Sequence, residues 1–119
     1  MRVRIALLVG AVCVCLAVVI VAQDAVKVDA KHYSVISEND QVRIVKVHYG
    51  VGEKSVMHSH PNSVAVFLTD GHAKMTTPDG KSQDMNVKAG DTMYSSAGSH
   101  LPENVGDKPF ELILVELKK

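Results

Sequence analysis

Cysteine is nearly absent from this chain of 119 residues: Cys13 and Cys15 are the only two, and both lie in an uncharged apolar run. The rest of the sequence therefore has neither a disulfide nor thiolate chemistry. We interpret the two cysteines as small apolar residues of that run. Neither follows the Leu-x-Ala/Gly pattern typical of a lipid-modified cysteine, so the sequence does not favour lipid attachment.

Tryptophan is absent, aromatic residues make up 4% of the chain, and 13 basic residues are balanced by 13 acidic ones. Arg2 and Arg4 belong to the N-terminal segment, so the remainder of the chain is slightly acidic. Proteins that bind nucleic acids use basic patches and exposed aromatic side chains. The composition therefore gives no support to nucleic-acid binding.

Residues 1–22 have the pattern of a signal peptide, with a short basic start followed by an uncharged apolar stretch. Cleavage after Ala22 would leave Gln23 as the first residue. The stretch also approaches the length of a bilayer span, so a retained N-terminal membrane anchor is the alternative. Because the basic start favours the inner face of the membrane, both outcomes predict a periplasmic or secreted domain, which contacts a membrane only if the anchor is retained.

Beyond residue 22, short runs rich in β-branched residues alternate with turn residues, and no helical spacing of apolar residues persists. We expect residues 23–41 to form a linker and edge strands, with the alternating Val26 and Val28 as one candidate strand and residues 32–37 as another. The main domain is expected over 42–119. In it we predict a loop at 96–107 and strands at 42–49, 56–60, 63–69, 72–77, 81–87, 92–95 and 110–117.

This pattern predicts a single all-β domain, either a sandwich or a barrel. So short a chain has a small core and exposed strand edges or apolar outer faces. We therefore expect a homodimer, in which a second copy covers such a surface.

The most informative stretch runs from Gly52 to Gly71. His58 and His60 lie two residues apart, so on a strand their side chains project from the same face. The spacing Gly52-x5-His58-x-His60-x3-Val64-x6-Gly71 resembles the first conserved motif of the cupin family. The segment from Gly90-Asp91 through Ser96-Ala97-Gly98-Ser99-His100-Leu101-Pro102-Glu103-Asn104 resembles the second. The resemblance implies a cupin-type double-stranded β-helix (jelly-roll) barrel with His58, His60 and His100 as metal ligands in its open mouth.

The sequence departs from the family pattern in two ways. Val64 stands where the family usually has a metal-binding glutamate. Ser96 stands where the second motif has proline, and the second motif is one residue shorter between its glycine and His100. Three imidazoles without a carboxylate suit a divalent transition metal, and we consider Fe, Zn, Ni, Cu and Mn. Such a site leaves positions open for water or an anionic ligand.

If the strand after Pro61 alternates from Val64 onward, Val64, Val66 and Leu68 line the interior while Ala65 and Phe67 face outward. The pocket beside the metal is then apolar. A small organic anion that binds the metal and rests its carbon skeleton on this wall is the expected ligand.

Several other polar residues have two interpretations. His32 and His72 are expected to be ordinary hydrogen-bonding residues. His48 is either such a residue or an outer partner of the metal ligands. Glu103 and Asn104 either orient His100 or move a proton beside it, or else belong to a solvated loop, and Tyr94 is a candidate pocket phenol.

Three classes of function remain open on the sequence alone. The first is a metal-dependent enzyme, such as a dioxygenase, an isomerase or a hydrolytic catalyst. Some cupin dioxygenases use three histidines and no glutamate, so the resemblance implies that Val64 alone does not exclude activity. The second is a module that binds a metal or a small ligand without turnover. The third is a structural barrel with a degenerate metal site. Whether the protein is an enzyme is not decided by the sequence.

Overall fold

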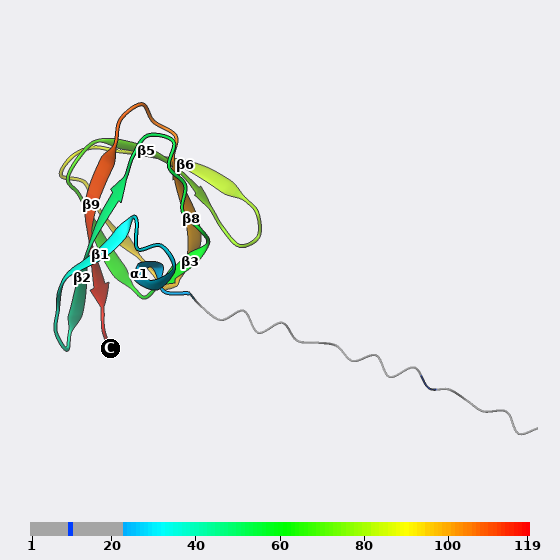
Figure 1. Cartoon of the computed structure of the whole chain (residues 1–119). Coiled ribbons are helices and arrows are strands. Elements are labelled where there is room, and N and C mark those ends of the chain that lie inside the picture. The colour runs from blue at the N-terminus through cyan, green and yellow to red at the C-terminus, as the bar shows by residue number, and fades with distance from the viewer. Residues whose placement is uncertain (1–9, 11–22) are drawn as a thin grey trace, which may run out of the picture.

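The computed structural model describes residue 10 and residues 23–119 (Figure 1). The predicted signal peptide or anchor, with Cys13 and Cys15, lies outside the described residues except for Gly10. Within the part of the chain that is described, no helix has the length and apolar character needed to cross a membrane.

One helical turn precedes a series of antiparallel strands. In chain order the elements are α1 (Ala25–Val28), β1 (Tyr33–Glu38), β2 (Val42–Tyr49), β3 (His58–His60), β4 (Ser63–Phe67), β5 (Gly71–Thr76), β6 (Ser82–Val87), β7 (Thr92–Ser95), β8 (Gly98–Asn104) and β9 (Phe110–Leu117). The all-β prediction is confirmed.

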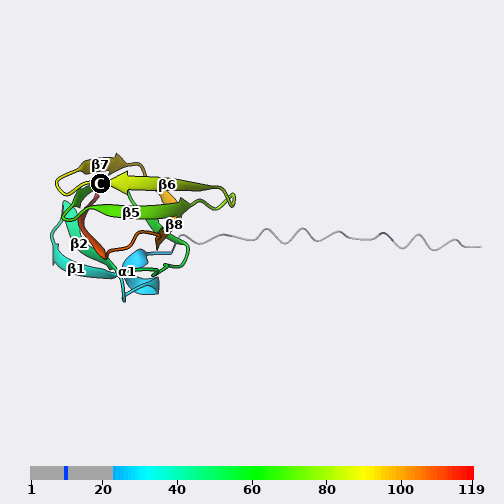
Figure 2. The ribbon, with the colours of Figure 1, turned by 90° about the horizontal axis from the view of Figure 1, so that it is seen from above.

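The strands form two sheets around a shared interior. The larger sheet has the order β1-β2-β9-β4-β7 and the smaller one β3-β8-β5-β6. Helix α1 lies beside β3 at one end (Figure 1), and the view from above shows β5 and β6 away from β1 and α1 (Figure 2). The interior between the two sheets is where the histidines of β3 and β8 meet the core.

Strands β2 and β9 form the centre of the larger sheet because both alternate apolar side chains along their length. In their antiparallel register Val45 lies opposite Leu114 and Val47 opposite Leu112. Val45, Val47 and Leu114 are buried in the core, with Tyr49 at the end of β2. The pattern of β-branched residues thus predicted both strands with their observed limits.

The direction of the side chains on β4 is opposite to the prediction. Ser63, Ala65 and Phe67 are buried and face the interior, whereas Val64 and Val66 lie half-buried on the outer face. The reason is that both faces of this strand are apolar: Val64 pairs with Val115 on one side and Tyr94 on the other. An alternation between two apolar faces does not reveal which one is inside.

The segment predicted as a loop over 96–107 contains β8, which lies between β3 and β5. Its first half pairs with β3. Its second half, which contains Pro102, pairs with β5. Gly98 is the first residue of β8 and Pro102 lies in its interior, where proline is unusual, so the sequence pattern did not predict this strand.

Residues 25–28 form a helical turn, so the strand suggested by the alternation of Val26 and Val28 is wrong. Asp24 caps this turn, since its carboxylate accepts a hydrogen bond from the Val26 N–H at 3.2 Å. Ala25 is fully buried. The expected edge strand further along is present as β1, at the end of the larger sheet.

Candidate metal centre

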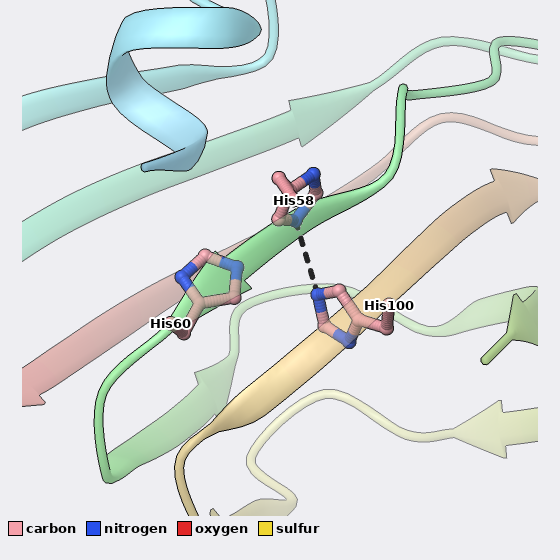
Figure 3. Close-up of side chains that lie close together, drawn as sticks. All are labelled: His58, His60 and His100. Carbon is pink, nitrogen blue, oxygen red and sulfur yellow. Dashed lines mark hydrogen bonds between the residues drawn. The ribbon is translucent and has the colours of Figure 1, made fainter. Parts of the chain in front are cut away.

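Three histidines from two neighbouring strands meet at one end of the interior (Figure 3). His58 and His60 project from the same face of β3, and β8 places His100 directly opposite His58. One ring nitrogen from each histidine lies within 4.8 Å of the other two. The Nε2 atoms of His58 and His100 are 3.1 Å apart. The cluster has the size and the donor set of a metal site.

Burial keeps two of these imidazoles neutral. It lowers the pKa of His58 to about 4, and the neighbouring His60 ring adds to this shift. Burial also lowers the pKa of His100 to about 3, with further contributions from His58 and His60. At neutral pH both rings are therefore in the form that binds metal ions.

His58 is oriented by its Nδ1 atom, which lies 2.8 Å from the carbonyl oxygen of Val56. Since a carbonyl only accepts, this contact assigns the ring proton to Nδ1 and leaves the Nε2 lone pair directed at the cluster. The hydroxyl of Ser55 lies 3.1 Å from the same nitrogen and donates to Asp29 Oδ2 at 2.5 Å. His58 thus has a fixed tautomer before any metal binds.

His60 is oriented by a buried carboxylate. Its Nδ1 lies 3.2 Å from Glu116 Oε1, and Arg43 donates to the other oxygen of Glu116 at 2.7 and 3.0 Å. Burial disfavours the charged form of Glu116, but the hydrogen bonds from His60 and Arg43 outweigh this effect and lower its pKa. Glu116 is therefore ionised and accepts the Nδ1 proton, which leaves Nε2 of His60 free for a metal.

A cavity of about 280 Å³ adjoins His60 and His100. Apolar side chains dominate its wall, including Ala65, Phe67, Met75, Met85, Met93, Leu112 and Leu114. Its other polar groups are hydroxyls, those of Tyr33, Ser63, Thr77, Ser95, Ser96, Ser99 and Tyr49. Among the described residues, no aspartate, glutamate, lysine or arginine lines it. A charged group that enters the cavity therefore meets no opposite charge from a protein side chain.

The family model for the cupin domain matches residues 45–116. This chain belongs to the cupin family. Solved structures agree: a cupin domain from Bordetella pertussis Tohama I is 25% identical, with a TM-score of 0.68 over 73% of this chain and 92% of that one. A conserved protein from Klebsiella pneumoniae with a double-stranded β-helix domain is also 25% identical, with a TM-score of 0.59 over 71% and 74% of the two chains.

An RmlC-like cupin family protein from Methanocaldococcus jannaschii shares the double-stranded β-helix fold at 20% identity, with a TM-score of 0.57 over 75% of this chain and 83% of that one. Among curated proteins, none matches this chain. The cupin-type jelly-roll fold predicted from the two motifs is confirmed, and the three predicted ligands form one cluster compatible with metal binding.

One other expectation for this cupin is wrong, and two open alternatives are resolved. Val64 does not line the cavity, whereas its neighbour Ala65 does. His48 lies on the outer face, where its Nδ1 contacts Glu111 at 3.0 Å. It is therefore an ordinary hydrogen-bonding residue and not an outer partner of the three histidines. Tyr94 is 59% exposed on the same outer face and is not a pocket phenol.

The remaining polar residues are structural. Asn104 is buried, and its amide donates to the carbonyl oxygens of Tyr49 and Lys108. It therefore neither orients His100 nor lies in a solvated loop. Glu103 is half-buried in β8, where it lies opposite Lys74 of β5 in the strand register. It makes no hydrogen bond to His100. The prediction for His32 and His72 is confirmed: His32 contacts Asp29 and Glu53, and His72 contacts Asp84.

Sequence reasoning missed the polar groups that surround the three histidines. They are Asp24, Asp29, Arg43, Ser55 and Glu116. Glu116 alone had a local signal, because it follows Phe110, Leu112 and Leu114 on the inward-facing positions of β9. A carboxylate at such a position needs a buried partner.

Proposed function

We propose that this cupin binds a divalent transition metal through His58, His60 and His100 and holds a small organic anion beside it. The observation that carries the proposal is the convergence of three imidazoles, two of them neutral through burial and two fixed at Nδ1 by an acceptor. Neutral imidazole suits Fe, Zn, Ni and Cu, and no carboxylate belongs to the cluster among the described residues.

The cavity supports a ligand with one anionic group and an apolar body. At about 280 Å³ it lies just below the usual size of a small-molecule site. Because no aspartate, glutamate, lysine or arginine adjoins it within the described chain, a bound metal is the natural partner for the anionic group. The methionines and leucines would contact the carbon skeleton, and their flexibility suits ligands of varied shape.

Apart from the histidines, the described residues offer no evident general acid or base in the cavity. The two tyrosines in the wall, Tyr33 and Tyr49, bond to each other through their hydroxyls at 2.7 Å. Burial raises the pKa of Tyr49 to about 12 and that of Tyr33 well above its usual value. Both phenols thus stay protonated at neutral pH, which disfavours an isomerase that needs a protein base.

We therefore place ligand binding first and a dioxygenase second. A bound metal ion supplies Lewis-acid chemistry, and iron would add oxygen chemistry. The protein residues would orient the ligand, and the apolar wall would exclude water from it. A non-catalytic barrel with a degenerate metal site is the outcome if no ion binds.

Elemental analysis of the protein purified without chelators tests the proposal. We expect about one metal ion per chain, lost in His58→Ala and in His100→Ala. His48→Ala is the matched control, since His48 is exposed on the outer face, and it should keep its metal. A metal-free wild type, or an equal loss in the control, would overturn the assignment. Calorimetry with short aliphatic and aromatic carboxylates then compares the metal-loaded and metal-free forms.

A further inference from the structure

We propose that the segment from Asp24 to Asp29 is part of the metal centre, with its two aspartates acting as positioning residues for His58 and His60. The proposal rests on the metal-binding function above. The segment lies before the residues that match the cupin domain, 45–116. Two separate hydrogen-bond chains join it to the two histidines of β3.

The first chain runs from Asp29 to His58. Asp29 Oδ2 accepts from the Ser55 hydroxyl at 2.5 Å, and that hydroxyl lies 3.1 Å from Nδ1 of His58. The Asp29 side chain is 9% exposed, so these contacts exclude most water. Asp29 also contacts Nδ1 of His32 at 2.8 Å, and Nε2 of His32 in turn contacts Glu53 at 3.0 Å. His32 thus holds the Asp29 carboxylate in the orientation that reaches Ser55.

The second chain runs from Asp24 to His60. Both oxygens of Asp24 accept from Arg43, at 2.7 and 2.9 Å, in the two-pronged geometry that fixes a guanidinium. Arg43 donates to Oε2 of Glu116, while Oε1 of Glu116 faces His60. Each Glu116 oxygen therefore has its own partner, and Arg43 determines how the carboxylate meets the imidazole ring.

The helical turn joins the two chains into one unit. Asp24 caps its start, and the N–H of Asp29 closes it by donating to the carbonyl of Ala25 at 2.8 Å. The backbone N–H of Ser59, the residue between the two histidines, donates to the carbonyl of Gln23 at 2.6 Å. Figure 3 shows this turn above β3, where the pair of histidines lies. The segment is thus attached to the ligand strand by its backbone as well as by its two carboxylates.

Groups that hydrogen-bond metal-ligating histidines fix the tautomer and the ring orientation, and their loss typically weakens metal binding by 10- to 100-fold. We therefore expect Asp24→Asn and Asp29→Asn each to raise the Zn²⁺ dissociation constant by roughly 10-fold. Asparagine keeps the cap and one acceptor, so both variants are mild changes to the fold. Asp40→Asn, at an exposed turn outside both chains, is the matched control and should bind Zn²⁺ as the wild type does.

The experiment uses the full chain, a chromophoric chelator to compete for Zn²⁺, and the visible spectrum of the Co²⁺ form. A positioning role predicts a changed Co²⁺ spectrum together with the weaker affinity. Ser55→Ala should reproduce the Asp29→Asn result, while Ser55→Thr, which keeps the hydroxyl, should restore wild-type affinity. Arg43→Lys should reproduce Asp24→Asn, because lysine cannot bridge both carboxylates in the same way.

The ¹⁵N resonances of the metal-free protein give a readout that does not need a metal. In the wild type His58 and His60 should carry their protons on Nδ1, and Asp24→Asn should change His60 while Asp29→Asn changes His58. Wild-type affinity, spectrum and tautomers in both variants would overturn the positioning role. If the wild type binds no metal but the tautomers respond as expected, the proposed function fails and the positioning of the two rings stands.

Discussion

His58 and His100 face each other across the pairing of β3 and β8, with their Nε2 atoms 3.1 Å apart. Because the contact with the Val56 carbonyl assigns the His58 proton to Nδ1, its Nε2 accepts and His100 donates from Nε2. In the metal-free site, His58 and His60 therefore carry their protons on Nδ1, the tautomer that can bind a metal through Nε2, whereas His100 has the other tautomer. This asymmetry has a measurable consequence.

We predict that His100 changes tautomer when the site is loaded, whereas His58 does not. Ligation through Nε2 requires the proton of His100 to leave that atom, and Nδ1 of the same ring is free to take it. Titration of ¹⁵N-labelled protein with Zn²⁺ measures this directly. His48, exposed on the outer face, is the internal reference, and an unchanged His100 spectrum with bound Zn²⁺ would contradict ligation by Nε2.

A carboxylate added at position 65 should strengthen Mn²⁺ binding, whereas one at position 64 should not. Ala65 lines the cavity with His60 and His100, and Val64 lies on the opposite face. Ala65→Glu should destabilise the metal-free protein, because it buries an unpaired charge, and Mn²⁺ should then raise its melting temperature. Val64→Glu, which adds the same glutamate on the outer face, is the control. A larger Mn²⁺ shift in Val64→Glu would show that β4 is oriented the other way.

The stability of the fold should depend on Glu53 in acid. The Lys31 ammonium 2.5 Å away lowers the pKa of Glu53 to about 2, with help from His32 and the Gly50 N–H. A carboxylate with a lowered pKa stabilises the folded state above its unfolded pKa, and the benefit is lost as pH falls from about 4.5 toward 2. Melting curves from pH 7 to pH 2 should therefore fall more steeply in the wild type than in Glu53→Gln. Parallel curves would contradict the prediction.

Two copies of the chain should associate through the outer face of the larger sheet. Ile44, Val115, Val64 and Tyr94 form a continuous row across four strands there, and Ile113 and Val66 form the next. Such an apolar surface favours pairing with a second sheet. Val115→Lys should give a monomer by light scattering, while Val51→Lys, at an exposed loop position away from this face, should not. A monomeric wild type would exclude this dimer.

If residues 1–22 are a signal peptide that is cleaved after Ala22, the mature protein begins at Gln23. Fractionation of the source cells and sequencing of the mature N-terminus measure this outcome. An intact N-terminus in the membrane fraction would favour the anchor instead. Full-length protein in the cytoplasm would contradict both.

The sequence predicted most of the strands and the pairing of His58 with His60 because both have local signals, whereas His100 was predicted from the resemblance to the cupin family. Alternating β-branched residues mark β2 and β9, and the spacing of His58 and His60 fixes their shared face. The orientation of β4 was not predictable from its pattern, because Val64 and Ala65 are both apolar and an alternation between two apolar faces does not show which one is inside.

The groups around the histidines lacked a local signal for a different reason. Arg43 and Glu116 are 73 residues apart, and Asp29 and Ser55 are 26 apart. Side-chain pairs of this kind are set by how the sheets fold together, and no spacing within a motif encodes them. The pairing of Arg43 with Glu116 becomes visible only when the register of β2 with β9 is known.

The oxidation state of the three methionines in the cavity wall would report whether an oxidant forms beside the histidines. Thioethers are readily oxidised to sulfoxides, each gaining one oxygen atom. Met75, Met85 and Met93 line the same cavity as His60 and His100, whereas Met57 does not. If an oxidant forms at the metal, peptide mass spectrometry should find sulfoxide at the three cavity residues ahead of Met57. In a protein that only binds its ligand, the oxidation of each methionine would follow its solvent exposure, so the cavity residues distinguish an oxygenase from a carrier.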